Sequence, residues 1–210
     1  MHYNIRYIKH SIESLLRCYG LRDHIYNKSG VNKAIRLPRI VQGGENIIIE
    51  GNSYIYGDSL ILAAKGKFIL KKNSGIAARL SADPDNHLYQ VGEKIGEEGN
   101  NNLEPGLIEI DEDVWIGMNV TLLSGTRIGR GAIVGGGTVL RDAKIPPYAI
   151  VVGNPGKVVG FRYTPDEIIK HEELNYKPED RLDISLLEKN YDKYFISRIK
   201  QIREFLSIKL

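Results

Sequence analysis

The sequence offers little that would cross-link the chain or carry it through a membrane. Cys18 is the only cysteine, so no disulfide can form within the chain, and this fits a reducing cytoplasm. No apolar run approaches the roughly 20 residues of a transmembrane helix, and the N-terminus lacks the apolar centre of a signal peptide. We therefore expect a cytoplasmic protein whose only contact with a membrane would be peripheral, at the inner membrane face.

A large excess of charge is also missing. The 210 residues include 29 Lys and Arg against 26 Asp and Glu, which gives a formal net charge of +3. That excess is too small to indicate nucleic-acid binding, although it suits a small anionic ligand. The length is sufficient for one domain with a sizeable core and terminal extensions.

The main positive feature is an aliphatic residue at every sixth position from 110 to 158, interrupted only at Pro146. These residues are Ile110, Ile116, Leu122, Ile128, Val134, Leu140, Val152 and Val158. The position four residues after each is often small or β-branched, as at Val114, Val120, Thr126, Ala132 and Thr138. A period of six is neither the 3.6 of a helix nor the 2 of a strand, and it is typical of a parallel β-helix. Three segments would make one triangular coil, with equivalent aliphatic residues stacked in the core.

The same period begins more weakly upstream. Its members there are Ile49, Ile55, Ile61, Leu70, Ile76 and Ala82. A slip of three residues near Gly66 indicates a longer turn at one corner. Residues 83–109 then break the repeat with a stretch rich in Gly, Asn, Pro and Glu. We expect this stretch to leave the prism as a long loop, and such loops are often functional.

Both ends of the chain depart from the repeat. Residues 1–46 are expected to form a partly helical cap segment, and residues 163–210 a helical extension. Thr164 to Glu167 has the pattern of a capping box, which predicts a helix as far as about Leu174. Apolar residues at helical spacing predict a second, amphipathic helix over residues 184–206. They are Ile184, Leu187, Tyr191, Phe195, Ile199, Ile202 and Leu206.

Two stretches are more specific than a generic repeat: V-W-I-G at 114–117 and G-N-P-G-K at 153–157. With the repeat around them, residues 47–162 resemble the hexapeptide-repeat acyltransferases, and most of all the bacterial sugar and polysaccharide O-acetyltransferases. The resemblance implies a mainly β fold, the left-handed parallel β-helix, assembled as a homotrimer. It also implies acetyl-CoA as the co-substrate and a saccharide acceptor, such as a surface or capsular polysaccharide or its precursor.

His87 is the candidate general base. It stands in D-P-D-N-H-L-Y, which is similar to the D-N-H stretch that carries the catalytic histidine of the family. A neutral imidazole can remove the proton of a hydroxyl as its oxygen attacks a thioester. The resemblance also implies that Asp85 and Asn86 bind acceptor hydroxyls, and Asp83 or Asp85 could instead orient the imidazole. The alternative is a loop histidine with a structural role, in a turn that Asp and Asn favour.

The resemblance implies a binding site for acetyl-CoA at residues distant from His87 in the sequence. Its candidate members are Trp115, lining the acceptor and pantetheine groove; Ser124 and Gly125, offering a backbone N–H to the oxyanion; Gly135, Gly136 and Gly137, leaving room for pantetheine; and Lys157 and Arg162, near the phosphates. For the glycines the alternative is turn geometry alone, and for the two cations an exposed surface position.

Other functions stay open at this stage. An N-acetyltransferase acting on an amino sugar or a nucleotide sugar, and a serine O-acetyltransferase, would use the same fold. A non-catalytic β-helix scaffold would need neither His87 nor Trp115 nor the G-N-P-G-K motif. A zinc hydrolase needs three histidines around its metal, and the remaining four, His2, His10, His24 and His171, lie in the terminal regions, so no metal is expected. Cys18 lacks a neighbouring base, which favours direct transfer over a covalent intermediate.

Overall fold

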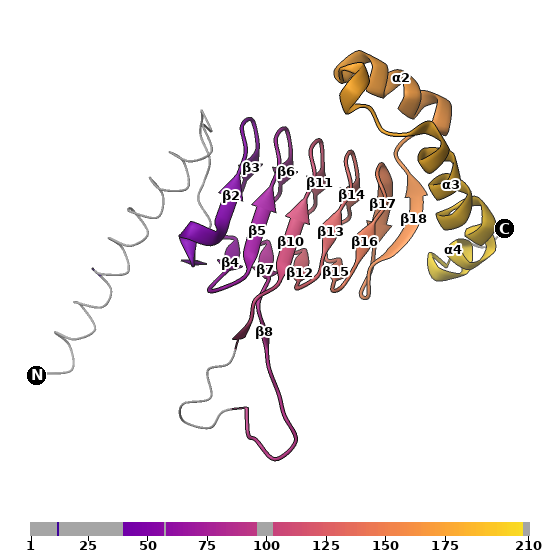
Figure 1. Ribbon diagram of the computed structural model, residues 1–210. Coiled ribbons are helices and arrows are strands. Elements are labelled where there is room, and N and C mark those ends of the chain that lie inside the picture. Colours follow the sequence, from indigo (N-terminus) through magenta and orange to yellow (C-terminus); the bar gives the residue numbers. More distant parts are fainter. Residues whose placement is uncertain (1–11, 13–39, 57, 96–102, 208–210) are drawn as a thin grey trace, which may run out of the picture.

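The computed structural model describes residues 12, 40–56, 58–95 and 103–207, and these form a parallel β-helix with helices packed at its C-terminal end (Figure 1). The cap segment expected over residues 1–46 lies almost entirely outside the described residues. Cys18 and the histidines His2, His10 and His24 lie outside them as well.

Three sheets form the faces of the prism. The first sheet contains β1 (Ile40–Gln42), β4 (Leu60–Leu62), β7 (Ser81–Asp83), β12 (Thr121–Leu123) and β15 (Val139–Leu140). The second contains β2 (Ile47–Ile49), β5 (Lys67–Leu70), β10 (Leu107–Ile110), β13 (Arg127–Ile128) and β16 (Lys144–Ile145). The third contains β3 (Tyr54–Ile55), β6 (Gly75–Ile76), β11 (Trp115–Ile116), β14 (Ile133–Val134), β17 (Ala149–Val152) and β18 (Lys157–Phe161). A short 3-10 turn, η1 (Gly44–Asn46), links β1 to β2.

The residues of the six-residue period form the core, as predicted. Those from Ile110 to Leu140 are buried, and so are the small or β-branched residues four positions after each. Upstream, Ile49 lies opposite Leu70, and Leu70 opposite Ile110, so the weak early repeat is part of the same stack. The stack alone supplies a continuous apolar interior, because each coil buries its aliphatic side chains against the next.

The turns at the corners of the prism explain the six-residue period, and they also explain why it fails after Leu140. Asp113, Asn119, Gly125, Gly131 and Gly137 have positive φ, a conformation that Asn, Asp and Gly adopt more readily than other residues. The interval then shortens by one, and the next such corner residue is Asp142. A one-residue shift reverses which side chains point inward. Val151 is therefore buried opposite Val134, and the prediction that Val152 points inward is wrong.

The parallel repeat also ends earlier than predicted. We expected parallel coils as far as Val158, but β18 runs antiparallel to β17. Gly153, with φ +99°, begins the turn that reverses the chain. Val158 is still buried, although as part of this closing hairpin and not of another coil.

The C-terminal extension is helical, with one departure from the prediction. The capping box of Thr164 and Glu167 is present, and α2 spans Pro165–Asn175. The single helix expected over 184–206 is divided into α3 (Ile184–Tyr194), η3 (Ile196–Arg198) and α4 (Ile199–Phe205), after a short turn, η2 (Pro178–Asp180). The chain bends at Phe195, so the apolar stripe does not stay on one face. Leu187 and Ile202 are buried, whereas Ile184 and Ile199 remain 48% and 37% exposed.

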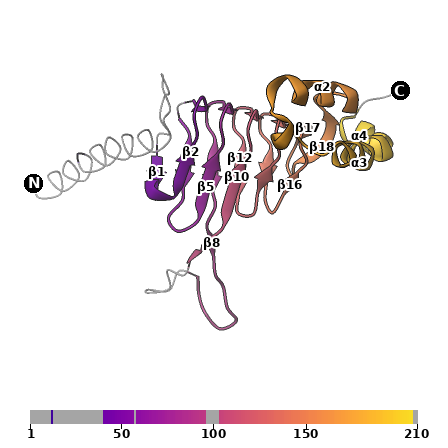
Figure 2. The same cartoon turned by 45° about the horizontal axis from the view of Figure 1, so that its top comes forward.

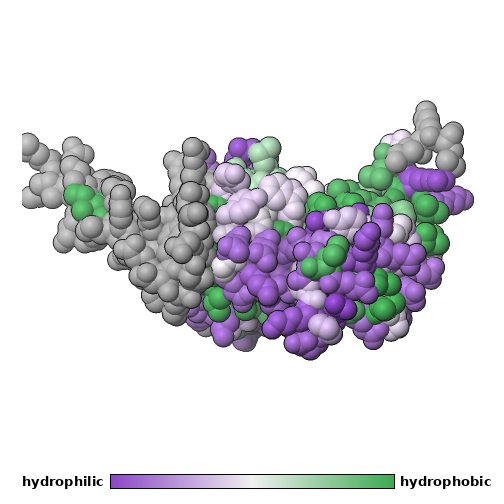
Figure 3. Space-filling model, turned by 90° about the horizontal axis from the view of Figure 1, so that it is seen from above, coloured by the Kyte–Doolittle hydropathy of each residue, from purple (hydrophilic) through white to green (hydrophobic). Residues whose placement is uncertain are grey.

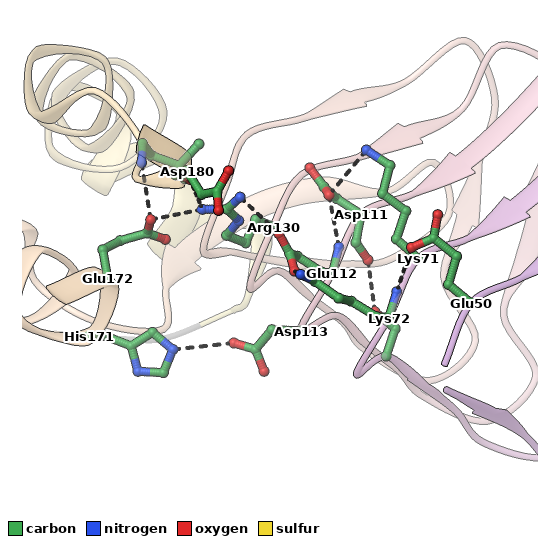
Figure 4. Close-up of polar contacts among 12 residues, drawn as sticks. Glu50, Lys71, Lys72, Asp111, Glu112, Asp113, Arg130, His171, Glu172 and Asp180 are labelled. Atoms are coloured by element: carbon green, nitrogen blue, oxygen red, sulfur yellow. Dashed lines mark hydrogen bonds and ion pairs between the residues drawn. The ribbon is translucent and has the colours of Figure 1, made fainter. Parts of the chain in front are cut away.

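A buried polar network fixes α2 to the corner between the second and third sheets (Figure 4). The guanidinium of Arg130 donates to Glu112 and to Glu172, each at 2.8 Å. Glu172 also accepts from the hydroxyl of Tyr148. Burial raises the pKa of that hydroxyl, and the charge of Glu172 adds to the effect. Seen from above, this side of the molecule is largely hydrophilic, with hydrophobic residues gathered toward the C-terminal helices (Figure 3).

Candidate active site

The stretch predicted to leave the prism does so at the corner between the first and second sheets, and we call residues 84–106 the arm. Its base is a two-stranded antiparallel pair, β8 (Asn86–His87) with β9 (Leu103–Glu104), in which His87 lies opposite Leu103. The arm projects away from the prism in both ribbon views (Figures 1 and 2). Residues 96–102, at its far end, lie outside the described residues.

Asp85 attaches the arm to the preceding coil. Its carboxylate accepts from the backbone N–H of Lys65 at 3.0 Å and of Gly66 at 2.6 Å. Both amides belong to the longer corner that the slip of three residues predicted. A Cβ atom at Gly66 would lie 2.7 Å from the carbonyl oxygen of Gly106, so glycine is needed for this close approach. With both carboxylate oxygens bound to backbone amides, Asp85 positions the arm in this geometry.

His87 is exposed on the arm, on the same side of the solenoid as Asp83. Asp83 is partly buried and accepts from the backbone N–H of Asp85 at 3.0 Å. Burial raises the pKa of the Asp83 carboxyl, and the hydrogen bond from Asp85 and the charge of His87 oppose that shift.

Apolar side chains accompany His87 along the arm. Tyr89 is 80% exposed, and Val91 is fully exposed. Leu88 and Ile95 are also exposed. Four exposed apolar side chains on a projecting segment indicate a surface that another molecule covers.

Ser124 lies at the base of the arm. A Cβ atom at Gly106 would lie 2.0 Å from the hydroxyl oxygen of Ser124 and 2.4 Å from the carbonyl oxygen of Pro84, so these three residues are packed closely together. The neighbouring Gly125 donates its N–H to the carbonyl oxygen of Leu107 at 3.1 Å. That N–H is therefore committed to coil stacking and is not free to stabilise an oxyanion, which leaves Ser124 as the candidate at this corner.

Gly135, Gly136 and Gly137 lie at a different corner, between the third and first sheets. Gly135 donates its N–H to Val151, and Gly137 donates to Met118. A Cβ atom at Gly117 would lie 2.6 Å from the backbone nitrogen of Gly136. These glycines thus serve the stacking of coils, and they contribute no side chains of their own to this corner. We call the corner formed by Gly117, residues 135–137 and Gly153 the glycine edge.

Trp115 lies on the outer side of the third sheet. It is 41% exposed, and its ring centroid is 6.5 Å from that of Tyr54. The arm leaves the prism at the corner that the third sheet does not share. A single chain therefore does not bring Trp115 and His87 together. Trp115 does lie near the glycine edge, because Gly117, a member of that edge, follows it by two residues.

Lys157 and Arg162 stand at opposite ends of β18 and do not meet. The ammonium group of Lys157 lies 4.9 Å from the centroid of the Phe205 ring, near the glycine edge. The guanidinium of Arg162 is bound to Asp113 at 2.7 Å, at the corner that carries the buried polar network. The antiparallel course of β18 separates the two cations, so Arg162 makes a structural contact with Asp113 and, of the two, Lys157 lies near the glycine edge.

Some residues near Lys157 could not have been identified as site residues from the sequence. Arg198 of η3 and Gln201 and Phe205 of α4 lie beside Lys157, but no motif marks them, and only the folded chain brings these elements to β18. Among the described residues, no group of three or more His, Cys, Asp or Glu side chains is placed to hold a metal ion. None of the described helices combines the length and apolar character that crossing a bilayer requires.

A parallel β-helix with a histidine-bearing arm and a glycine edge defines the class of protein: a transferase built on hexapeptide repeats. The family model "Bacterial transferase hexapeptide (six repeats)" matches residues 108–142. A "Probable macrolide acetyltransferase" of Lysinibacillus sphaericus is 30% identical over 136 residues, 63% of this chain and 75% of that protein. The chain belongs to the hexapeptide-repeat acetyltransferase family.

Other relatives are matched over less of their length. A "Probable acetyltransferase" of Mycobacterium tuberculosis is 35% identical over 127 residues, which are 59% of this chain but 36% of that protein. The chain thus spans about a third of the length of several curated relatives that it matches, with values of 36%, 36% and 29% for three of them.

Solved structures establish the fold as the left-handed β-helix of this family. A maltose O-acetyltransferase of Clostridium difficile 630 has a TM-score of 0.57 at 21% identity, covering 73% of this chain and 88% of that one. A galactoside acetyltransferase in complex with coenzyme A has a TM-score of 0.57 at 19% identity, covering 81% and 88%. An N-acyltransferase of Bacillus cereus, in complex with dTDP and coenzyme A, has a TM-score of 0.53 at 15% identity, covering 69% and 86%.

Proposed function

We propose that this protein is an acetyl-CoA-dependent O-acetyltransferase that modifies a hydroxyl group of a saccharide, with His87 as the general base. The observation that carries the proposal is the exposed imidazole of His87 on a projecting arm whose base is clamped to the solenoid by Asp85. Similarity to the maltose and galactoside acetyltransferases supports the choice of a saccharide acceptor. A surface or capsular polysaccharide, or its precursor, is the acceptor class we favour.

The reaction needs one group that accepts a proton and later returns it. The oxygen of the sugar hydroxyl attacks the carbonyl carbon of the thioester while the neutral imidazole of His87 takes the hydroxyl proton. As the carbon–sulfur bond breaks, His87 gives that proton to the departing thiolate of coenzyme A. The acetyl group passes directly to the sugar, without a covalent enzyme intermediate. In this scheme Asn86 contacts the acceptor, and Ser124 lies near the developing oxyanion.

We further propose that the active site forms between subunits of a homotrimer. The first sheet is flanked by the arm on one side and by the glycine edge on the other. Its outward side chains are mostly uncharged and only half-buried: Leu60, Leu62, Ser81, Thr121, Leu123 and Val139, with Asp83 as the charged member. Association through this sheet about a three-fold axis would bring the arm of one chain to the glycine edge of the next. It would also cover the exposed apolar side chains of the arm.

The glycine edge fits the long, thin pantetheine chain of acetyl-CoA. Gly136 and Gly137 are exposed, and a Cβ atom at Gly136 would meet only backbone atoms of Met118 within 4 Å, while one at Gly137 would meet nothing. Trp115 and Met118 border the edge with exposed apolar surface, which suits the methylene and methyl groups of pantetheine. Lys157, at the C-terminal end of the edge, offers a positive charge to a phosphate.

The test of the base is the variant His87→Ala. Acid–base assistance is typically worth about 10² to 10⁴ in rate, so kcat should fall by that factor while the Kd for acetyl-CoA stays near its original value. In the parent protein the rate should decline at acid pH, because a protonated imidazole cannot accept the hydroxyl proton. This decline should be absent from the residual activity of the variant.

His171→Ala is the matched control, since His171 lies on α2 and pairs with Asp113 at 3.5 Å, away from the arm. It should retain its turnover and its pH profile. If His87→Ala folds, binds acetyl-CoA and keeps most of its turnover, His87 is not the base.

A second candidate is N-acetyl transfer to an amino sugar or a nucleotide sugar. The fold similarity to the Bacillus cereus N-acyltransferase favours keeping it. Matched acceptors that carry either a hydroxyl or an amine at the same ring position would separate the two reactions by mass spectrometry of the product. A scaffold role predicts no acetyl transfer to any acceptor and no binding of acetyl-CoA.

A further inference from the structure

The N-terminal part of the third sheet carries a cluster of exposed aromatic side chains. Tyr54 and Tyr56 lie in and just after β3, and Trp115 lies in β11, while β6 runs between the two strands (Figure 1). All three side chains are exposed, Tyr56 the most at 52%. The other exposed aromatic residues of the described part of the chain, Tyr89 and Phe205, lie on the arm and on α4. We call Tyr54, Tyr56 and Trp115 the aromatic platform.

The three rings form one surface because a glycine lies beneath them. The ring of Tyr54 meets that of Tyr56 edge to face, with centroids 5.4 Å apart, and its centroid is 6.5 Å from that of Trp115. In the sheet, Gly75 lies opposite Tyr54 on one side and opposite Trp115 on the other. A Cβ atom at Gly75 would lie 2.6 Å from the Tyr54 ring. Glycine at this position therefore lets Tyr54 reach across β6 toward Trp115.

The platform continues the glycine edge toward the N-terminal end of the solenoid. The backbone N–H groups of Tyr56, Ala77 and Gly117 each donate to a carbonyl oxygen of the following coil, at 2.8 to 2.9 Å. These three residues thus occupy the same position in successive coils. Gly117 is the first member of the glycine edge, and Tyr56 lies two coils beyond it. A ligand on the platform would lie in line with a ligand on the edge.

The level of the arm decides which part of this line an acceptor can use. The arm leaves after β7 and returns in β10, so it projects between the coil of β5 to β7 and the coil of β10 to β12. In a trimer whose axis is parallel to the solenoid, it meets the next chain at the same level, where Ala77 and Gly117 lie. The proposed donor extends from there toward Gly135 and Gly153. The acceptor must then approach from the opposite direction, where the platform lies.

A fixed cation stands at the same corner. Arg79 follows Ala77 by two residues, and its Nε donates to the side-chain oxygen of Asn119 at 2.6 Å. Both side chains are exposed. A partner that is apolar throughout would leave the guanidinium without an acceptor. A saccharide, in contrast, offers apolar ring faces to the platform and hydroxyl oxygens to the guanidinium.

We propose that the aromatic platform binds the sugar units next to the one that is acetylated, so that the acceptor is an oligosaccharide or a polysaccharide and not a free monosaccharide. The C–H groups on the face of a sugar ring suit the negative π-face of an aromatic ring, and the phenol hydroxyls of the two tyrosines can hydrogen-bond to the sugar hydroxyls. The separation of the rings is similar to the length of one sugar unit, so neighbouring rings can contact neighbouring units. This inference rests on the proposed transfer to a saccharide, and it adds the length of the acceptor and the roles of Tyr54 and Tyr56.

The fluorescence of Trp115 makes the platform directly observable, because Trp115 is the only tryptophan of the chain. The full chain is titrated with glucose, with maltohexaose and with a panel of oligosaccharides released from bacterial surface polysaccharides. Longer saccharides should change the emission at lower concentrations than their single sugar units do. In Tyr56→Ala the Kd of a saccharide that binds should rise about tenfold, while the Kd for acetyl-CoA, measured by calorimetry, should not change.

Three further variants distinguish the ring, its placement and its position on the molecule. Tyr56→Phe keeps the ring and should retain most of the saccharide affinity. Gly75→Ala keeps all three rings but displaces that of Tyr54, so it should weaken saccharide binding and leave acetyl-CoA binding unchanged. Ile48→Ala, which removes an exposed side chain of the second sheet, is the control and should leave both affinities unchanged.

The proposal is overturned if the parent protein binds no saccharide of the panel, or if Tyr56→Ala and Gly75→Ala bind saccharides as tightly as the parent does. It is also overturned if thymidine diphosphate, and no saccharide, changes the emission of Trp115 in a way that depends on Tyr56. Saccharide binding that depends on Tyr56, in a protein that does not bind acetyl-CoA, would support the platform and contradict the proposed acetyl transfer.

Discussion

At the scale of single residues, Glu172 is a buried carboxylate that depends on several hydrogen-bond donors. Glu172 is 2% exposed, and its carboxylate accepts from Arg130, from Tyr148 and from the backbone N–H of Leu182 at 3.0 Å. Arg130 itself is 9% exposed, and among the described residues it pairs with one carboxylate of α2, that of Glu172, and one of the solenoid, that of Glu112. Removing Glu172 would leave a buried guanidinium half-paired and a buried hydroxyl without its acceptor.

We expect Glu172→Ala to lower the free energy of unfolding by about 3 to 5 kcal/mol, the usual effect of breaking a buried ion pair. Glu173→Ala is the matched control, because the neighbouring Glu173 is exposed, and its effect should be close to zero. Urea denaturation followed by circular dichroism measures both. Equal midpoints for the two variants would show that the network does not stabilise the docking of α2.

At the scale of elements, the orientation of the arm depends on Asp85. Its two hydrogen bonds to the amides of Lys65 and Gly66 join the arm to a neighbouring corner, and the β8–β9 pair gives the arm its only regular structure among the described residues. Without these two hydrogen bonds the arm would fix the position of the His87 imidazole less precisely. A displacement of a catalytic group by about 1 Å can lower the rate about a hundredfold.

Asp85→Ala should therefore reduce kcat by about tenfold to a hundredfold, with an unchanged KM for acetyl-CoA and an unchanged pH profile, because His87 is still the base. Glu104→Ala is the control, since Glu104 is an exposed carboxylate on the opposite strand of the arm. Steady-state kinetics and limited proteolysis of the arm should change together in Asp85→Ala. A shifted pH profile would instead assign Asp85 to the chemistry.

At the scale of the whole molecule, activity should depend on association through the first sheet. Leu123 points outward from β12 of that sheet, whereas Ile48 points outward from the second sheet and is 41% exposed. Association about a three-fold axis joins different surfaces of neighbouring chains, and burying an arginine in such an interface without an acidic partner is unfavourable.

Leu123→Arg should give a monomer of 23.6 kDa with little activity, because the arm would no longer reach a glycine edge. Ile48→Arg introduces the same charge on a different face and should remain trimeric and active. Light scattering coupled to size-exclusion chromatography measures the mass. A fully active monomer would show that one chain contains a complete site and would contradict the proposed assembly.

The sequence by itself determined the features that depend on short-range pattern. The six-residue period placed Ile110 to Leu140 in the core, because an inward side chain at each sixth position is enough to define a coil. The capping box at Thr164 likewise predicted the start of α2, since a helix N-terminus is satisfied by its own first turn. The departure of the chain after Ala82, which carries His87, was visible as a break in the same period.

Only the tertiary structure decided what depends on partners distant in the sequence. The shortened corner at Asp142 moved the inward position to Val151, although the local sequence suits Val152 equally well. The N–H groups of Gly125, Gly135 and Gly137 are bound to carbonyl oxygens of other coils, and Arg162 is bound to Asp113. The bend at Phe195 brings α4 against β18 and creates a cavity beside Lys157. Each outcome follows from packing between segments that the chain brings together only after it has folded, and a local pattern carries no record of such contacts.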